Sequence, residues 1–431
     1  MSAKVYSLLK MNKYKMISII FFSLFLALGS IWFCAKRNLL LILYNSGCIT
    51  PEDYAAIEKY SKKFNSVLID VEKQETAGDI YNYLKSNYSR FPRTIKGVQI
   101  FGTQADVPSF NFKFKCKDEK GKINDFQRPT SFVSDLCYSN FAASAESFRE
   151  PLNIYDIMET KLPFSFVPKW QVSRLPLTSG EISKYIKKYD KFKKQNPSNT
   201  LPIRAFVCST LAEAGNPDDF GYFFKERLDK EFSFLKPGSY KIYGSTLGEF
   251  PITSRDDEFT IKNIAKENRS GAKDFFIATH GHESAAYHSI KRPGEKTHTL
   301  LKFLNTENAN RVLKHNYYTL TAWCCHLAHG LNETNFIHKI MTGKCIDAIA
   351  PVHILSGNDL IKDAPLTELG NNNPFYFYYE FFKNLNKGFS RSKSFTKAKA
   401  SYANAVLKHQ DRYNYQFNLH NVLAYHYFGL I

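Results

Sequence analysis

Two apolar runs of this sequence each end in a side chain that could take part in covalent catalysis. Residues 275–281 (FFIATHG) deliver His280, and residues 320–325 (LTAWCC) deliver a cysteine. In an open α/β sheet the carboxyl ends of neighbouring strands border one crevice, so we expect the imidazole and the thiol to meet there. Because a thiol is mostly protonated at neutral pH, a nearby imidazole is needed to activate it. The pattern predicts a cysteine hydrolase, and among such enzymes it favours a peptidase.

The neighbours of the two cysteines favour Cys325 as the nucleophile. Cys325 has a small residue before it, Cys324, and another three residues after it, Ala328, whereas Cys324 follows the bulky Trp323. A turn that packs closely under a substrate favours small neighbours, so Cys324 is the alternative. The glycine after the histidine, Gly281, would let the backbone approach a substrate and point its N–H at the developing oxyanion.

A metal site is a second interpretation of the same segments, because they contain ligands of the kind that zinc prefers. The candidate ligands are His280, His282, Cys324, Cys325, His326 and His329. Metallo-β-lactamase-type hydrolases have Asp and His where this chain has Ser284 and Ala285. Adjacent cysteines on a continuing strand also point to opposite faces, which hinders joint ligation. A metal-dependent hydrolase is therefore the weaker hypothesis, and we assign no metal ligands.

Composition limits the class of protein and its partners. The chain has 431 residues, and 44% of them are hydrophobic, which is enough for a substantial core. Its 58 Lys and Arg residues against 40 Asp and Glu give a net charge of +18, which favours acidic partners such as anionic lipid. The basic residues are scattered and no nucleic-acid motif is present, so we expect no nucleic-acid partner. Eight cysteines are too few for a disulfide scaffold.

The N-terminus resembles a targeting segment. Residues 16–33 form an uncharged apolar run that is just long enough to span a bilayer, and four lysines precede it. Positive charge before the run predicts that the chain after it lies outside the cytoplasm. We expect an uncleaved signal-anchor over residues 1–35, with a cleaved signal peptide and secretion as the alternative.

The rest of the chain alternates strand and helix patterns. Strands are expected at residues 38–44, 66–71, 96–101, 203–208, 239–243, 274–279, 318–323 and 345–352, with helices at 51–65, 77–86, 374–385 and 394–408. This alternation predicts an α/β fold with mainly parallel, helix-covered sheets. We divide it into two abutting subdomains, residues 36–160 and a catalytic part at 161–431. Early in the second, Thr178 or Ser179 should cap a helix with Glu181 in its first turn.

Several segments, in this order and spacing, resemble the gingipain-type cysteine peptidases, which share a caspase-like core. The matching segments are 95–102 (IKGVQIFG), 107–108 (VP), 172–176 (VSRLP, similar to a "VGR" segment), 260–264 with 279–285, 320–330, 348–351 and 427–429. Together they extend over nearly all of residues 38–431. The resemblance implies a caspase-like α/β fold.

The resemblance also implies an activity and a set of roles. It implies hydrolysis of peptide bonds in protein or peptide substrates, with His280 as base, Cys325 as nucleophile and the Gly281 amide in the oxyanion hole. It implies no required cofactor, although members often bind calcium, for which no site is assigned here. The membrane would be reached through residues 16–33.

The chain departs from the family pattern near the histidine. The family has an acidic partner for the His, and the matching position here is Lys169. Glu283 is the candidate substitute as orienting acid, or the pair works as a dyad. Glu181 lies near the region that supplies an acidic specificity residue in members that cleave after Arg. The departure at Lys169 also leaves a catalytically inactive, membrane-tethered binding module as an alternative function.

Overall fold

The computed structural model describes most of the chain from residue 38 onward. The described residues are 38–89, 95–113, 116–117, 123–124, 131–143, 152–153, 166–196, 205–209, 233–234, 240–244, 257–271, 274–290, 299–353, 355, 375–408 and 415–431, with Ser18, Phe21 and Ser23. The predicted anchor, residues 16–33, lies outside the described residues apart from those three. Among the helices of the described part of the chain, none has the length and apolarity needed to cross a membrane.

An eleven-stranded sheet carries the candidate site. From edge to edge its strands are β12 (Asp257–Glu258), β11 (Lys241–Gly244), β10 (Ala205–Ser209), β13 (Asp274–Ala278), β17 (Tyr318–Trp323), β18 (Cys345–Pro351), β19 (Tyr425–Phe428), β9 (Gln171–Leu175), β3 (Ile95–Phe101), β1 (Leu39–Tyr44) and β2 (Ser66–Asp70). The pairs from β12 to β18 and from β9 to β2 are parallel, whereas β19 is antiparallel to β18. The predicted α/β fold with a mainly parallel sheet is confirmed.

The two halves expected from the sequence share this sheet. β9, from the start of the second half, pairs with β3 of the first half, and Phe428 of β19 pairs with Arg174 of β9. One hydrophobic cluster extends from Leu40 to Leu430. The boundary between residues 160 and 161 itself stays a prediction.

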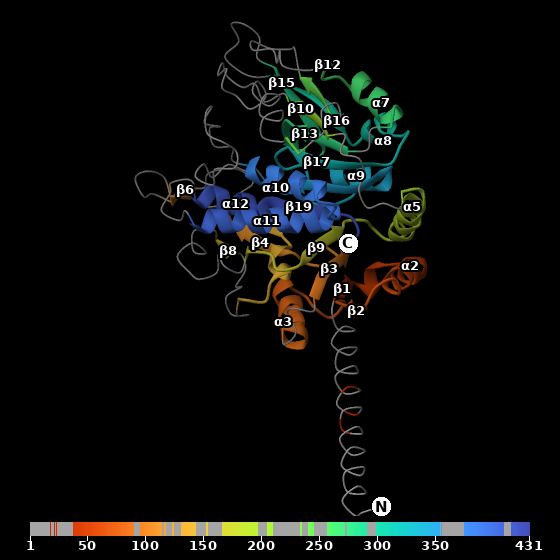
Figure 1. Ribbon diagram of the computed structural model, residues 1–431, viewed down its shortest axis with the longest axis vertical. Coiled ribbons are helices and arrows are strands. Elements are labelled where there is room, and N and C mark those ends of the chain that lie inside the picture. The colour runs from red at the N-terminus through yellow and green to blue at the C-terminus, as the bar shows by residue number, and fades with distance from the viewer. Residues whose placement is uncertain are drawn as a thin grey trace, which may run out of the picture.

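Smaller sheets and helices flank the central sheet. The small sheets are β14 (His280–His282) with β15 (Ala285–Ile290) and β16 (Thr299–Asn305), then β7 (Ser131–Ser134) with β4 (Phe110–Lys113) and β8 (Leu152–Asn153), and β5 (Cys116–Lys117) with β6 (Ile123–Asn124). The helices are α2 (Pro51–Ser61), α3 (Ala77–Tyr88), α5 (Ile182–Gln195), α7 (Ile261–Arg269), α8 (Ala309–Val312), α9 (Phe336–Thr342), α10 (Phe375–Asn386), α11 (Arg391–Lys408) and α12 (Tyr415–Ala424). Figure 1 shows α10, α11 and α12 together in front of the sheet, and α2 beside α5 at its right.

Local sequence explains where the first helices begin. Thr50 accepts a hydrogen bond from the backbone N–H of Asp53, and the Asp53 carboxylate accepts one from the N–H of Thr50. Thr76 and Asp79 form the same reciprocal pair at the start of α3. Each pair satisfies backbone donors that have no partner inside the helix, which fixes the first turn.

The prediction that Thr178 or Ser179 caps the N-terminus of α5 is wrong. Neither Thr178 nor Ser179 occupies the N-cap position of that helix. Instead Asp53, which is fully buried, accepts hydrogen bonds from the backbone N–H groups of Gly180 at 2.5 Å and Ser183 at 2.7 Å. A carboxylate at a helix start satisfies free donors and interacts favourably with the helix dipole. The cap therefore comes from the neighbouring helix α2, which a local sequence pattern could not reveal.

Candidate active site

The two apolar runs that carry the expected chemistry are neighbouring strands. β13 and β17 pair in parallel, with Ala278 opposite Trp323, and the N–H of Thr279 donates to the carbonyl of Trp323 at 3.0 Å. His280 follows Thr279 on one strand, and Cys324 follows Trp323 on the other. Both strands are buried along their whole length, so their last residues are held in fixed positions. The structure therefore places the segments that carry the predicted histidine and the cysteine pair side by side, while the contact between imidazole and thiol stays a prediction.

Gly281 packs directly against the cysteine pair. A Cβ atom at this position would lie 2.4 Å from the carbonyl oxygen of Cys325 and 2.7 Å from the Cβ of Cys324. Both distances are far shorter than any non-bonded contact allows, so only glycine fits without moving the backbone. We expected the glycine to permit close approach of a substrate. In the structure a close contact with Cys324 and Cys325 already requires glycine and sets the spacing between the histidine and cysteine segments, and the approach of a substrate stays a prediction.

The two cysteines differ in their surroundings. Cys324 is fully buried, and its Sγ lies 3.5 Å from the carbonyl oxygen of Ile277. Burial raises the pKa of the Cys324 thiol well above its ordinary value, which keeps it protonated at neutral pH. Cys325 is partly exposed, and the backbone N–H of Leu355 donates to its Sγ at 3.5 Å. A backbone donor directed at sulfur stabilises a thiolate.

The turn after Cys325 is strained and firmly attached. His326 has a φ of +57°, a conformation that few non-glycine residues adopt. Its backbone N–H donates to the carbonyl of His353 at 3.1 Å, and that of Ala328 donates to Pro351 at 2.9 Å. These bonds fix the turn to the end of β18. Strained backbone of this kind persists only where the surrounding structure holds it in place, and it gathers at functional sites.

A cluster of buried rings lies behind the turn, and sequence reasoning missed it. The ring of His326 is 5.0 Å from that of His353, whose Nδ1 is 2.8 Å from Nε2 of His420. Phe132 packs against His353 and His420 at 4.9 and 5.0 Å between ring centroids. The four rings come from distant segments, so spacing gave no signal beyond the presence of His326 beside the cysteines.

These buried histidines predict a loss of stability in mild acid. Burial lowers the pKa of the half-buried His326 to about 3 and that of the buried His420 well below its ordinary value. A further buried histidine, His426, lies 3.9 Å from Asp135, and burial lowers its pKa to about 3. Unfolded histidines bind protons below a pH of about 6.5 while the buried ones stay neutral, so stability falls as the pH drops. Each fully buried histidine should cost about 2 kcal/mol between pH 6.5 and 5.0. Urea unfolding at both pH values measures this.

The variant His420→Gln tests the origin of that loss. Gln keeps a group that can hydrogen-bond to His353 but does not titrate, so the variant should lose less stability on acidification than the wild type, by about 2 kcal/mol. An equal acid loss in both proteins would show that His420 does not contribute to it.

The structure locates the two residues that bear on the missing acid. Lys169 is exposed, and its backbone N–H donates to the carbonyl of Ser139. Glu283 lies in the turn between β14 and β15, where its backbone carbonyl accepts from the N–H of Phe336 and its carboxylate lies beside Gly330. Its predicted role as the orienting acid stays a prediction.

Glu181 is part of a local hydrogen-bond network. Its Oε2 accepts from the backbone N–H of Thr178 at 3.0 Å, from the Thr178 hydroxyl at 2.9 Å, and lies 2.8 Å from Nε2 of His338. Burial alone would raise the pKa of Glu181, but the bonds from His338 and Thr178 outweigh it and lower that pKa to about 2. These bonds join the start of α5 to α9.

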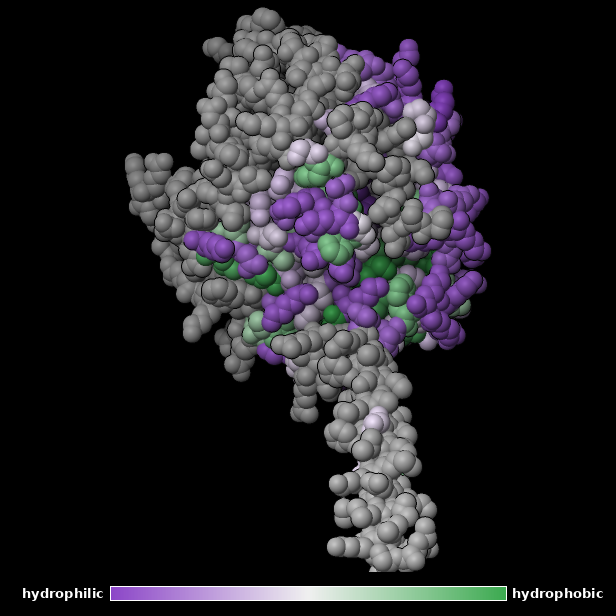
Figure 2. Space-filling model, in the orientation of Figure 1, coloured by the Kyte–Doolittle hydropathy of each residue, from purple (hydrophilic) through white to green (hydrophobic). Residues whose placement is uncertain are grey.

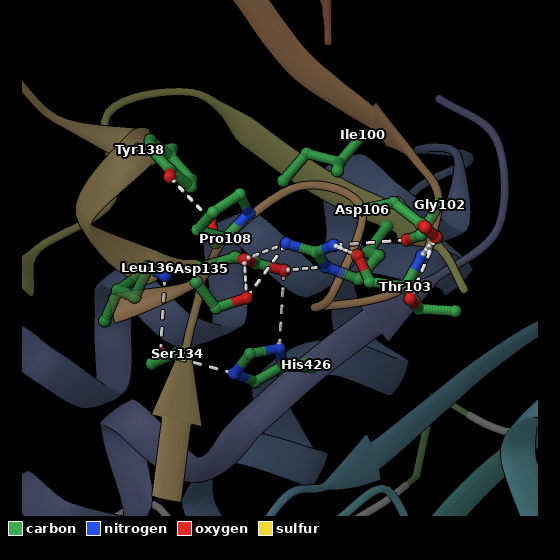
Figure 3. Close-up of polar contacts among 12 residues, drawn as sticks. Ile100, Gly102, Thr103, Asp106, Pro108, Ser134, Asp135, Leu136, Tyr138 and His426 are labelled. Carbon is green, nitrogen blue, oxygen red and sulfur yellow. Dashed lines mark hydrogen bonds and ion pairs between the residues drawn. The ribbon is translucent and has the colours of Figure 1, made fainter. Parts of the chain in front are cut away.

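The VSRLP segment provides a buried ion pair (Figure 3). Arg174 donates from Nε and Nη2 to the two carboxylate oxygens of Asp135, at 2.8 and 2.7 Å. Asp135 is labelled in Figure 3, where dashed lines mark the contacts of its carboxylate. Its Nη1 donates to the carbonyls of Gly102 and Thr103 at the end of β3. Burial alone would raise the pKa of Asp135, but Arg174 outweighs it and the pKa is lowered. The arginine therefore fastens β9 to β3, a role that the sequence did not reveal.

Within the described ranges, no three His, Cys, Asp or Glu side chains are grouped so that they could hold a metal ion. Neither the zinc site of the alternative interpretation nor the calcium implied by the resemblance has a matching ligand group there. Whether the protein binds a metal ion stays a prediction.

The fold is similar to that of known cysteine peptidases. The crystal structure of the Arg-specific cysteine proteinase gingipain R (RgpB) matches with a TM-score of 0.56 at 14% identity, covering 92% of this chain and 77% of that one. The complex of the pro- and mature domains of RgpB from Porphyromonas gingivalis matches with a TM-score of 0.55 at 13% identity, covering 91% and 78%. A structure described only as a protease gives 0.56 at 13%, covering 91% and 77%.

The sequence comparisons add no relative. Neither the protein-family models nor the curated proteins give a match to this sequence. The structural likeness therefore defines the fold: the chain has the gingipain-like, caspase-type architecture that its motifs resemble.

Proposed function

We propose that this protein is a cysteine peptidase in which Cys325 is the nucleophile and His280 the general base. The observation that carries the proposal is the packing of Gly281 against Cys324 and Cys325, with His280 directly before the glycine, at the ends of two neighbouring strands. The partial exposure of Cys325, beside a fully buried Cys324, supports the choice of nucleophile. The gingipain-like fold supports peptides or proteins as substrates.

The proposed reaction follows from these groups. His280 takes the proton of the Cys325 thiol, and Sγ attacks the carbonyl carbon of the scissile peptide bond. The N–H of Gly281 stabilises the oxyanion of the tetrahedral intermediate. His280 then gives its proton to the departing amine, which leaves a thioester on Cys325. A water molecule, deprotonated by His280, attacks the thioester and releases the carboxylate product and the free thiol.

Two acidic residues have secondary places in the proposal. Glu283 is retained as the candidate that orients His280. The bonds from Thr178 and His338 to Glu181 favour a structural role for that carboxylate, since its acceptor oxygen is already engaged. No cofactor takes part in any step.

Active-site labelling tests the proposal. A panel of peptidyl acyloxymethyl ketones is incubated with the full-length chain under reducing conditions, and the labelled peptide is identified by mass spectrometry. We expect one adduct, on Cys325, because only a partly exposed and activated thiolate reacts quickly with such a probe. The His280→Ala variant should lose the adduct, and an adduct on Cys324 would reassign the nucleophile.

A second candidate function is an inactive relative that acts as a binding module. The observation that favours it is Lys169, an exposed cation at the position that matches the family's acidic residue. This candidate predicts a folded protein that no probe of the panel labels. Labelling of Cys325 would exclude it, and its absence on folded protein would contradict the peptidase.

A further inference from the structure

A cavity of about 440 Å³ lies away from the candidate active site. Its lining includes Lys96, Gln171, Thr319 and Asp347, which stand at or near the starts of β3, β9, β17 and β18. The hydroxyl of Ser392 donates to the side chain of Gln171, which places the start of α11 at the same edge. The candidate nucleophile follows the opposite end of β17, and six residues of strand span roughly 20 Å. The cavity is therefore a separate site.

The lining carries more positive than negative charge. Its charged side chains are Lys63, Lys96, Lys193 and Arg391 against Asp190 and Asp347. Arg391 is neutralised, because it donates to Asp347 at 2.6 Å and to Asp274 at 2.8 Å. Lys63 forms an ion pair with Asp190. These pairs account for both acidic residues of the lining.

Lys96 has no such partner. Among the described residues its ammonium contacts the ring of Phe64, 4.4 Å from the centroid, and no carboxylate lies within ion-pair distance. Burial, and then the nearby Lys393, lowers the pKa of Lys96, so the positive charge of this lysine is poorly compensated where it stands. Lys193 lines the same cavity, and its ammonium lies 5.4 Å from the ring centroid of Tyr189. An anion in the cavity would supply the compensation.

The remaining walls combine aromatic rings with hydroxyl groups. Tyr60, Phe64, Tyr189, Phe192 and Tyr427 form the aromatic part, and Ser390 and Ser392 supply hydroxyls. On the face drawn in Figure 2, apolar surface shows between hydrophilic side chains close to where Figure 1 marks the C-terminus. The volume lies in the range of small-molecule sites, about 300–1,000 Å³, which are typically apolar with a few fixed polar groups.

We propose that this cavity binds a phosphate ester that carries an aromatic or other apolar body. The phosphate would lie between Lys96 and Lys193 and accept a hydrogen bond from Ser390, and the body would lie along Phe64 and Tyr189. The start of α11, an 18-residue helix, adds its positive dipole end to the same place. A soluble nucleotide and a phospholipid headgroup share this chemistry. The proposal is independent of the peptidase activity.

Calorimetric titration of the full-length chain tests the proposal. The two probes are ADP and dioctanoyl phosphatidic acid below its micelle concentration, which represent the soluble and the lipid source. We expect at least one of them to bind, and Lys96→Gln and Lys193→Gln each to weaken that binding by about tenfold or more, since a hydrogen bond to a charged group is lost. Added salt should weaken it further.

A matched lysine provides the control. Lys59 is exposed on α2 and lies outside the lining, so Lys59→Gln makes the same change of charge and should bind the probe as tightly as the wild type. Cys325→Ala should also bind normally, which separates this site from the peptidase. If neither probe binds, or if Lys96→Gln binds as tightly as Lys59→Gln, the proposal is wrong.

Discussion

Replacing Cys325 by alanine should lower kcat/KM for peptide hydrolysis by at least about 10⁴-fold, because the variant has no nucleophile to form the thioester. KM should change little, since the thiol contributes to the reaction and not to holding the rest of the substrate. Stability should also change little, because Cys325 is partly exposed. The measurement is the steady-state rate with a peptide that the wild type cleaves, together with the urea midpoint of each protein.

Cys324→Ala is the matched control for that experiment. It removes the same atom one residue earlier, from a side chain that is fully buried and contacts the carbonyl of Ile277. The control should keep kcat within a few-fold of the wild type and lose about 1 kcal/mol of stability through the missing core contact. The inverse result, with activity lost only in Cys324→Ala, would place the nucleophile on the buried cysteine. Activity that survives in both variants would contradict a cysteine mechanism altogether.

The strands that place the site could be predicted from the sequence because each is buried on both faces. Parallel strands covered by helices read as continuous apolar runs. The prediction for β17, residues 318–323, agrees with the structure at both ends, and that for β13 differs by one residue. The continuous apolar runs in the sequence were therefore enough to predict that His280 and the cysteines follow the ends of neighbouring strands.

Other elements lack a local signal of that kind. β19 follows α12 directly, with Ala424 ending the helix and Tyr425 starting the strand, and no glycine or proline marks the change. In the β14–β16 sheet, β14 has only three residues, and the exposed side chains of Leu300 and Leu301 on β16 break the apolar alternation expected of a half-buried strand. Such strands are defined by pairing with distant residues, which a propensity or a periodicity does not record.

The finer arrangement of the site also depends on long-range contacts. Glycine after the histidine could be recognised as important from the sequence, but its close contact with the carbonyl of Cys325 could not. The Asp53 cap of α5 joins two helices that are more than a hundred residues apart. The rings of His353 and His420 reach the turn from separate segments. In each case the residue type was visible in the sequence, whereas its partner was fixed only by the tertiary structure.

Replacing Arg174 by methionine should lower the free energy of unfolding by about 3–5 kcal/mol, the cost of leaving one member of a buried ion pair alone. The side chains of Arg174 and Asp135 are 1% and 5% exposed, so water cannot take over the lost bonds. The carbonyls of Gly102 and Thr103 also lose their donor, which adds to the loss. Urea unfolding measures the effect.

The double variant Arg174→Met/Asp135→Leu separates the charge from the packing. Removing both charges leaves no buried ion, and replacing a buried pair by apolar residues is often close to neutral. The double variant should therefore recover much of the stability lost in Arg174→Met, with a remaining deficit of about 1–2 kcal/mol from the unbonded carbonyls. If the double variant is no more stable than the single one, the cost lies in packing around Arg174 and not in the unpaired Asp135. Since the pair joins β9 to β3, and β18 and β19 stand between β9 and the strand β17 that leads to Cys325, peptidase activity at low temperature should survive in both variants. That result would distinguish a structural arginine from one that acts in the reaction.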